Sequence, residues 1–268
     1  MPALFILFKR IYNISMKKFI EGVSKKAGRE LLRLFLTKRK YSKKSKHEIV
    51  TAADLISEKL ILSQIKKKFP GHQILSEEAG MNNIKSDYLW IVDPLDGTTN
   101  FSFGNPLFSI CIALTYKKKI IAGAVSIPVL KEFYYATKGQ GACLNGKKIH
   151  VSKTADLKSG FITFCHGSRQ QYVKEILKYY RELKLNFFDA RQLGSAGIEM
   201  AYIAGGRTDV YFAPGTNSWD VAAGVLIVRE AGGKVTNFKN QEWQITDKDI
   251  LATNGVLHNK FYRFIKNA

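Results

Sequence analysis

The sequence predicts an α+β protein in which helical and sheet layers alternate. Helical patterns open the chain, apolar and alternating segments over residues 109–149 indicate antiparallel strands, and short strands alternate with helices from residue 161 onward. With 268 residues, of which 46% are hydrophobic, the chain can bury a sizeable core. We therefore expect a single domain over residues 16–268, with two lobes at approximately 16–150 and 151–268.

The N-terminal region is predicted to be helical and basic. Between residues 15 and 38, apolar positions recur at helical spacing with Lys and Arg between them. Residues 1–15 precede this pattern as a possible N-terminal extension. Their apolar run is too short for a membrane span and lacks the flanks of a signal peptide, so we expect no membrane association. The Lys-rich residues 37–47 predict an exposed, mobile connection.

The remaining elements follow from apolar periodicity and from the positions of Gly and Pro. A second helix is predicted over residues 51–69, where Thr51 and Asp54 resemble a capping box, although the acid is usually Glu or Gln. Later helices are predicted over residues 170–183, 194–205, 218–231 with Ser218 as the cap, and 256–265. Strands are predicted over residues 73–76, 88–92, 110–116, 120–127, 132–137, 161–165, 186–190, 210–212, 234–236 and 250–252.

The charge distribution limits the classes of partner. The formal net charge is +20, and Lys and Arg outnumber Glu strongly within the first 50 residues. Such a surface attracts phosphorylated substrates, nucleic acid or anionic membranes alike. A solvated helix face explains the same charges without a specific partner, and the sequence carries no nucleic-acid motif with stacking aromatic residues.

The cysteine content indicates the compartment. Cys111, Cys143 and Cys165 lie far apart and lack the spacing of metal ligands. They predict free thiols in a reducing environment, which makes the cytoplasm the expected location.

Residues 90–101, with the sequence WIVDPLDGTTNF, carry the strongest functional signal. An apolar strand ends in Asp93 and Asp96, which can converge on hard cations. The backbone N–H groups of Gly97, Thr98 and Thr99 can bind a phosphate at a helix N-terminus. An ordinary strand-to-helix turn, with Asp96 in an Asx-turn and Thr98 as the N-cap, is the alternative. That alternative does not explain why the acidic Asp93 closes an apolar strand.

Three separated motifs occur in the order and spacing of one known family. They are Ser76-Glu77-Glu78, residues 90–101, and Trp219–Gly224 together with Glu230–Gly233. In this combination the chain resembles the inositol monophosphatase family, the Mg²⁺-dependent and Li⁺-sensitive phosphatases that share a layered αβαβα sandwich, the sugar-phosphatase fold, with fructose-1,6-bisphosphatase. The resemblance covers nearly the whole chain after about residue 16. It implies a phosphoric monoester hydrolase that works as a homodimer on a small phosphorylated substrate.

The resemblance implies a site with two or three Mg²⁺ ions. Glu77, Asp93 and the backbone carbonyl oxygen of Leu95 correspond to ligands of a first ion, and Asp93, Asp96 and Asp220 correspond to ligands of a second. Mg²⁺ prefers such oxygen donors and completes its shell with water and substrate phosphate. Taken alone, Glu77 resembles an exposed loop acid, and Asp220 resembles a favourable charge in the first turn of a helix.

The resemblance also implies the catalytic residues Glu77, Thr98 and Asp54. The family uses the Thr98 hydroxyl, together with an acid that matches Asp54, to orient the attacking water on the first metal ion. Metal coordination lowers the pKa of that water, and a second ion stabilises the departing alkoxide. A purely helix-capping role for Asp54 stays open as the alternative.

Substrate contacts are implied at two segments and at two of the acids. They are Asp96, Gly97, Thr98, Thr99, Gly194, Ser195, Ala196 and Asp220. A helix N-cap at Ser195 is the structural alternative. Ala213 stands where many family members carry a Glu that binds substrate hydroxyls, and its side chain offers no acceptor.

Two function classes follow from these observations. The first is Mg²⁺-dependent hydrolysis of inositol 1-phosphate to inositol and phosphate, by in-line attack of a metal-activated water. A broader sugar or polyol phosphatase, such as a fructose-1,6-bisphosphatase, is the alternative within the same chemistry. The second class is an RNA- or transcription-complex-binding protein that uses the basic surface.

Overall fold

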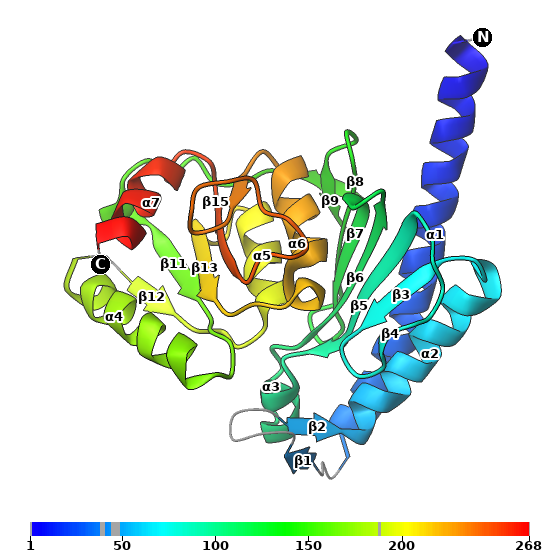
Figure 1. The fold of residues 1–268 in the computed structure, drawn as a ribbon, viewed down its shortest axis with the longest axis horizontal. Helices are drawn as coiled ribbons and strands as arrows, with labels where there is room; N and C mark the ends of the chain where they lie inside the picture. Colours follow the sequence, from blue (N-terminus) through cyan, green and yellow to red (C-terminus); the bar gives the residue numbers. More distant parts are fainter. Residues whose placement is uncertain (1, 38–40, 44–48, 187–188, 268) are drawn as a thin grey trace.

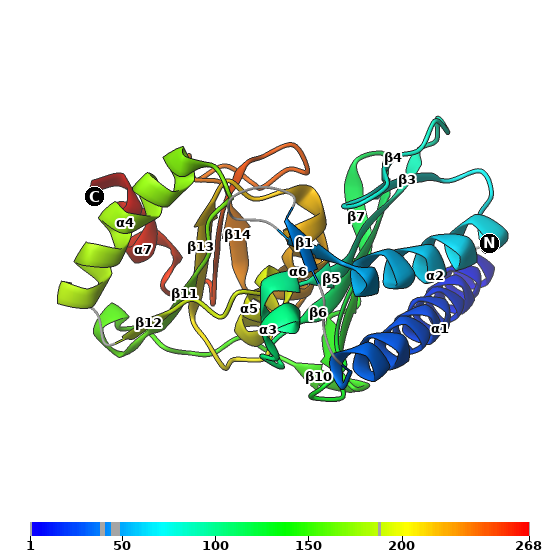
Figure 2. The same cartoon turned by 90° about the horizontal axis from the view of Figure 1, so that it is seen from below.

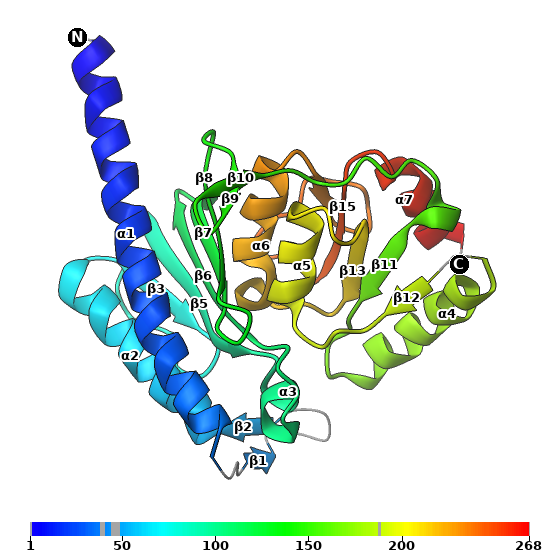
Figure 3. The same ribbon diagram turned by 180° about the vertical axis from the view of Figure 1, so that it is seen from behind.

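The computed structural model describes residues 2–37, 41–43, 49–186 and 189–267. Helices and sheets alternate in an αβαβα sandwich, as predicted (Figures 1 and 3). One outer layer consists of α1 (Pro2–Phe35) and α2 (Ala52–Lys68), the middle layer of α5 (Ala196–Ala204) and α6 (Ser218–Glu230), and the other outer layer of α4 (Gln170–Asn186) and α7 (His258–Asn267). Most of the predicted mobile connection, at residues 38–40 and 44–48, lies outside the described residues.

The larger sheet lies between the α1–α2 layer and the α5–α6 layer. Its strand order is β10-β9-β8-β7-β6-β5-β3-β4. The strands are β3 (Gln73–Ser76), β4 (Gly80–Met81), β5 (Tyr88–Asp96), β6 (Ser109–Tyr116), β7 (Lys119–Ile127), β8 (Glu132–Thr137), β9 (Ala142–Leu144) and β10 (Lys147–Ile149). Neighbouring strands pair antiparallel, as predicted for residues 109–149, except that β3 and β5 are parallel. The sequence did not predict β4, β9 and β10, because such short strands carry no apolar alternation.

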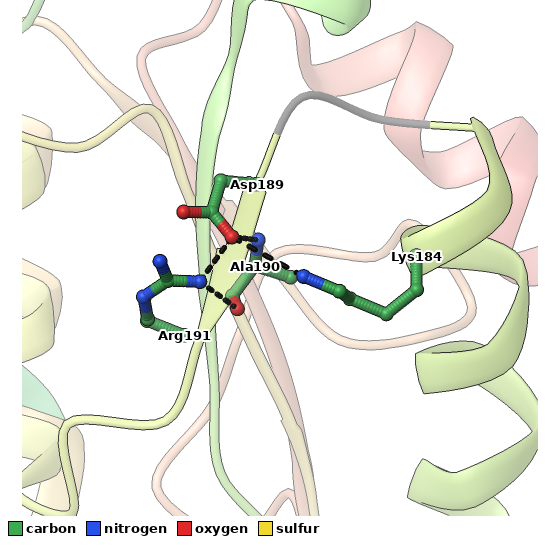
Figure 4. A network of polar contacts seen from close by, with 4 residues as sticks. All are labelled: Lys184, Asp189, Ala190 and Arg191. Carbon is green, nitrogen blue, oxygen red and sulfur yellow. Dashed lines mark hydrogen bonds and ion pairs between the residues drawn. The ribbon is translucent and has the colours of Figure 1, made fainter.

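The smaller sheet lies between the α5–α6 layer and the α4–α7 layer. Its strand order is β12-β11-β13-β15-β14, with β11, β12 and β13 parallel and β15 antiparallel to β13 and β14. The strands are β11 (Phe161–Phe164), β12 (Asp189–Arg191), β13 (Val210–Pro214), β14 (Lys234–Thr236) and β15 (Asp249–Thr253). At its edge, Asp189 accepts hydrogen bonds from Arg191 and, at 3.4 Å, from Lys184 of α4, so this carboxylate joins β12 to the helix that covers it (Figure 4).

Two short elements flank the carboxyl end of β5. A separate antiparallel pair, β1 (Tyr41–Lys43) and β2 (Ile49–Thr51), leads into α2. The helix α3 (Thr98–Phe103) follows β5 directly. Seen from below, α3 lies beside the end of β5 and near α5 (Figure 2). The structure thus gathers the termini of several elements at one end of the two sheets.

Helix boundaries differ from the sequence predictions at several places. Helix α4 ends at Asn186 rather than at Leu183, and α7 spans His258–Asn267 rather than residues 256–265. Helix α1 begins at Pro2 rather than at Ser15, because proline fits the first turn of a helix and no later residue breaks it. Its first turns project beyond the layers (Figures 1 and 3). Helix α6 is capped by Asn217 rather than by Ser218, and the Asn217 N–H donates to Asp220 at 2.8 Å.

Two glycines let the middle layer pack closely. A Cβ on Gly123 of β7 would lie 2.7 Å from the Ala223 carbonyl oxygen of α6. A Cβ on Gly224 would lie 2.4 Å from the side chain of Met200 in α5. Glycine therefore lets α6 approach both the larger sheet and α5, and this approach fixes where the first turn of α6 lies.

Two further predictions concern the state of the cysteines and the absence of membrane spans. All three cysteines are free, with Cys111 buried and the other two half-buried. In the part of the chain that the structure describes, no helix combines the length and the apolar content that a membrane span requires.

Candidate active site

The end of β5 carries Asp93 and Asp96 into the interior. Both side chains are buried, with exposures of 2% and 7%. In the pairing with β6, Asp93 lies opposite Cys111 and Asp96 lies opposite Ser109, so the register shifts between the two acids. This β-bulge bends the strand and re-aims its side chains, which is a common device beside active sites.

Asp93 lies within a group of four carboxylates. Burial raises the pKa of Asp93 well above its usual value, and the charges of Glu77, Asp96 and Asp220 raise that pKa further. Glu77 is held beside β5 because its N–H donates to the Val92 carbonyl at 3.2 Å. Asp220 comes from the first turn of α6. The fold therefore places the other three predicted metal-binding acids close enough to Asp93 to interact with it electrostatically, although they come from separate segments of the chain.

Asp96 faces the N-terminus of α5. Its oxygens accept hydrogen bonds from the Ser109 hydroxyl at 2.7 Å, from the Ser195 hydroxyl, and from the N–H groups of Ala196 at 3.0 Å and Gly197 at 2.8 Å. Burial raises the pKa of Asp96, and the hydrogen bonds from Ser195 and Ser109 oppose that rise. Asp96 thus links the end of β5 to the segment that was predicted to line the substrate pocket.

The donor set of this group fits Mg²⁺ in its chemistry. Uncompensated carboxylates repel one another in a buried site, and a divalent cation removes that repulsion. Within the described residues, no three acidic, histidine or cysteine side chains already converge closely enough to hold one ion. Asp96 is engaged at α5, and Asp93 accepts the Leu95 N–H at 3.0 Å. On binding an ion, Asp93 and Asp96 would therefore have to give up some of these hydrogen bonds in order to coordinate it.

Thr98 and Asp54 meet beside these carboxylates. The Thr98 hydroxyl lies 2.8 Å from the Asp54 Oδ1 atom and 3.0 Å from the Leu95 carbonyl oxygen. The Asp54 Oδ2 atom accepts the backbone N–H of Thr51 at 2.8 Å and its hydroxyl at 2.6 Å. Asp54 therefore caps α2 with one oxygen and accepts the Thr98 hydroxyl with the other, so its capping role is confirmed and its catalytic role stays a prediction.

Gly97 begins the helix that follows β5. It is the N-cap of α3 with φ +90°, a left-handed conformation that glycine adopts readily, so the alternative in which Thr98 is the N-cap is wrong. A Cβ at Gly97 would lie 3.0 Å from the Leu107 carbonyl and 3.1 Å from the Gly194 carbonyl. The predicted phosphate-binding turn is thus packed against the segment that opens α5.

A pocket of about 910 Å³ joins these parts. Of the predicted site residues, Glu77, Asp96, Thr99, Gly194, Ala196 and Asp220 line it, as does Ala213. Ser195 is buried, and as the N-cap of α5 its hydroxyl accepts the Ile198 N–H at 3.4 Å, so its capping alternative holds. Asp93 and Leu95 lie behind this lining within β5.

Sequence analysis missed several residues that shape the site. The Asn100 side chain donates to the carbonyls of Leu107 at 2.7 Å and Leu193 at 2.8 Å and so joins two loops. The buried Glu199 accepts the Leu193 N–H at 2.6 Å, and burial raises its pKa well above the usual value. An acid inside the otherwise apolar α5 was the available signal for Glu199. The role of Ser109 depends on pairing across the sheet, which no local pattern carries.

Comparison with known proteins identifies the family. The family model described as "Inositol monophosphatase family" matches residues 13–268. A fructose-1,6-bisphosphatase/inositol-1-monophosphatase of Thermotoga maritima is 38% identical over 81% of this chain and 82% of its own length. The Nus factor SuhB of Pasteurella multocida is 38% identical over 78% of this chain and 79% of its own length. The solved structure of the extragenic suppressor protein suhB from Bartonella henselae superposes with a TM-score of 0.90 at 33% identity, covering 95% of this chain and 99% of that one.

The fold, the acidic group at the end of β5 and the family match therefore agree. The family is generally metal-dependent, and small phosphorylated molecules are its substrates. The chain belongs to the inositol monophosphatase family and is a phosphoric monoester hydrolase.

Proposed function

We propose that this protein hydrolyses inositol 1-phosphate, or a closely related polyol phosphate, in a Mg²⁺-dependent reaction. The observation that carries the proposal is the Thr98 hydroxyl, which lies within hydrogen-bond distance of Asp54 and of the Leu95 carbonyl, beside the four carboxylates. Such a hydroxyl can position a water for attack on a phosphate ester.

The proposed metal ligands are Glu77, Asp93, the Leu95 carbonyl, Asp96 and Asp220, for two or three Mg²⁺ ions. When bound, Mg²⁺ supplies an activated water and neutralises charge on the phosphate. Every ligand in this set is an oxygen donor, which is the preference of Mg²⁺.

Thr98 and Asp54 are proposed to handle the proton of the attacking water. The Thr98 hydroxyl donates to Asp54, so its lone pairs remain available to accept a hydrogen bond from that water. Burial raises the pKa of Asp54, which makes its carboxylate a better proton acceptor than an exposed aspartate. Glu77, whose N–H donates to the Val92 carbonyl of β5, is proposed to complete the catalytic set.

Substrate binding is proposed to use the turn after β5 and the start of α5. The N–H groups of residues 97–99 are proposed to bind the phosphate, and Gly194, Ser195 and Ala196 are proposed to contact the hydroxyl-bearing ring. Asp96 and Asp220 would contact both metal and substrate. Because Asp96 already holds Ser195 and Ala196, the positions of the metal site and of the ring site are coupled.

Phosphate release tests this proposal. Inositol 1-phosphate and a panel of sugar phosphates and nucleotide 3′-phosphates would be assayed at equal concentration, with Mg²⁺ and with a chelator. We expect Mg²⁺-dependent release from inositol 1-phosphate. Absence of release from that substrate at saturating Mg²⁺ would refute the assignment. Inhibition by Li⁺, a homodimeric mass in solution and a cytoplasmic location are further expectations of the same proposal.

A second candidate function is association with RNA or a transcription complex. Relatives named Nus factor SuhB and the net charge of +20 favour it. This function predicts salt-sensitive RNA binding that survives Asp93→Asn. If the wild-type protein does not bind RNA near physiological salt, this second function is refuted, whereas the phosphatase proposal is unaffected.

A further inference from the structure

Helix α2 presents a buried polar face to the candidate active site. Ser57 and Glu58 follow Asp54 by three and four positions, so the three side chains lie on one side of the helix. All three are buried, with exposures of 0%, 0% and 7% for Asp54, Ser57 and Glu58. The helix packs against β5, which ends in Asp93 and Asp96. Because buried polar groups need hydrogen-bond partners, the partners of these three residues indicate what this face does.

Glu58 holds the loop that carries Glu77. The Glu58 Oε1 atom accepts the Ser76 hydroxyl at 2.5 Å and the Ala79 N–H at 2.9 Å. These two donors lie before and after Glu77 in the chain. The Glu77 N–H itself donates to the Val92 carbonyl of β5 at 3.2 Å. The backbone around Glu77 is therefore fixed both from α2 and from β5.

Ser57 holds the turn that follows Asp93. The Ser57 hydroxyl donates to the Pro94 carbonyl at 2.7 Å. The N–H of the same peptide unit, which belongs to Leu95, donates to the Asp93 Oδ1 atom at 3.0 Å. Both polar groups of this peptide are thus engaged, one by α2 and one by Asp93. The orientation of the Asp93 carboxylate therefore depends on a peptide that Ser57 fixes.

One turn of α2 therefore connects three segments of the candidate site. Since Asp54 accepts the Thr98 hydroxyl at 2.8 Å, α2 contacts the start of α3 as well as the loop after β3 and the end of β5. Carboxylates that are gathered in one place repel one another, and this repulsion drives their segments apart when no cation is bound. Hydrogen bonds to a single helix oppose that movement, because the helix backbone is itself held by regular hydrogen bonds.

We propose that Glu58 and Ser57 are positioning residues, which keep Glu77 and Asp93 at the spacing that a bound Mg²⁺ ion requires. This inference rests on the proposed Mg²⁺ dependence and adds two residues that act only through the candidate ligands. Within the described part of the chain, neither residue lines the pocket. Residues that orient metal ligands strengthen metal binding, because the ligands are already in place before the ion arrives.

Isothermal titration calorimetry of the full chain with Mg²⁺ alone tests the positioning role. Glu58→Met keeps an unbranched side chain of similar length but removes the acceptor, whereas Glu58→Gln keeps an oxygen that can accept from Ser76 and Ala79. We expect the Mg²⁺ dissociation constant to rise about tenfold or more in Glu58→Met and less than about threefold in Glu58→Gln. Ser57→Ala should raise it about threefold to tenfold, because only the hydrogen bond to the Pro94 carbonyl is lost.

Ser63→Ala is the matched control for Ser57→Ala. Ser63 is exposed on the same helix, and its hydroxyl donates only to the Leu60 carbonyl of α2, at 2.9 Å. Its removal should leave the Mg²⁺ dissociation constant within about twofold of the wild type. In assays of phosphate release, the Mg²⁺ concentration for half-maximal activity should rise together with the dissociation constant. The kcat at saturating Mg²⁺ should fall less, because Glu77 is then also held by coordination.

The melting temperatures of the same variants separate positioning from stability. A lower melting temperature in Glu58→Met and Ser57→Ala, with a Mg²⁺ dissociation constant equal to that of the wild type, would overturn the positioning role. An equal rise of the dissociation constant in Glu58→Met and Glu58→Gln would overturn it for Glu58. If Glu58→Met does not fold, the pair Ser57→Ala and Ser63→Ala decides the question. Absence of both Mg²⁺ binding and Mg²⁺-dependent phosphate release in the wild type would instead overturn the proposed function itself.

Discussion

The acidic end of β5 and the basic loops of the pocket are built in different ways. At the acidic end, a bulge and the N-terminus of α5 hold the buried Asp93 and Asp96, and the cap of α2 holds Asp54 beside them. The basic loops carry the exposed side chains of Arg169 and Lys248, and hydrogen bonds fix only the loop backbones. The comparison indicates that the buried framework positions the candidate catalytic groups, whereas the loops can tolerate substitution.

The largest expected effect is at the acidic end. Asp93→Asn removes the central carboxylate and should lower kcat by on the order of 10³-fold or more, since metal and substrate charge are no longer balanced. The fold should persist, because asparagine has nearly the same size. Phosphate release measures kcat, and circular dichroism measures whether the fold persists. Turnover within tenfold of the wild type would contradict the assigned role of Asp93.

A smaller loss is expected at the Thr98–Asp54 pair. Thr98→Val keeps the shape but removes the hydroxyl that lies 2.8 Å from Asp54, so kcat should fall by about 10²-fold. Thr98→Ser keeps the hydroxyl and serves as the control, with most activity retained. If both variants have the same kcat, the hydroxyl has no catalytic role.

Packing behind the acidic end gives a test through stability. A Cβ on Gly197 would lie 2.4 Å from the Cys111 sulfur and 2.6 Å from the Ser109 hydroxyl. Gly197→Ala should therefore lower the free energy of unfolding by about 1–3 kcal/mol, as other overpacked sites do. The helical Gly22 has no atom within 4 Å of such a Cβ, and Gly22→Ala should instead raise stability by ~0.5–1 kcal/mol. If urea unfolding gives the same change in the free energy of unfolding for both variants, α5 does not pack as described.

The smallest expected effect concerns pH and a histidine away from the pocket. His258, at the start of α7, is buried, and its nitrogens lie 3.1 Å and 3.0 Å from the hydroxyls of Thr236 and Thr253. Burial lowers the pKa of His258 from 6.5 to about 4. Because the folded protein favours neutral histidine, this stabilising contribution is present above pH 6.5 and is lost as the pH falls towards 4.

Urea unfolding between pH 7 and pH 4 measures this effect. The free energy of unfolding of the wild type should fall more steeply with decreasing pH than that of His258→Gln. Parallel curves for the two proteins would show that His258 does not titrate differently in the folded and unfolded states.

The sequence predicted the acidic end and missed the basic loops of the pocket for a physical reason. Asp93, Asp96 and Gly97 lie within one local strand–turn–helix signal, so their chemistry is visible in a short window. Arg169 and Lys248 line the same pocket because the backbones of their loops hydrogen-bond to Pro214 and Thr216, which lie far away in the sequence. Exposed Lys and Arg are common in this chain, and no local pattern distinguishes these two.

The fold shows the same division between local and distant information. The capping box of Thr51 and the antiparallel run over residues 109–149 were predicted correctly, because turns and periodicity are local. The start of α1 was wrong, since the sequence before Ser15 carries no helix-breaking residue to mark a boundary. The division into two lobes near residue 150, with residues 1–15 as an extension, stays a prediction.

Binding of Mg²⁺ in the absence of substrate tests the central claim most directly. The melting temperature of the wild type and of Asp93→Asn would be followed during a Mg²⁺ titration. Removing one of the crowded carboxylates should raise the melting temperature of the metal-free variant, whereas only the wild type should gain further stability as Mg²⁺ is added. An equal Mg²⁺-dependent rise in both proteins would contradict a metal site centred on Asp93.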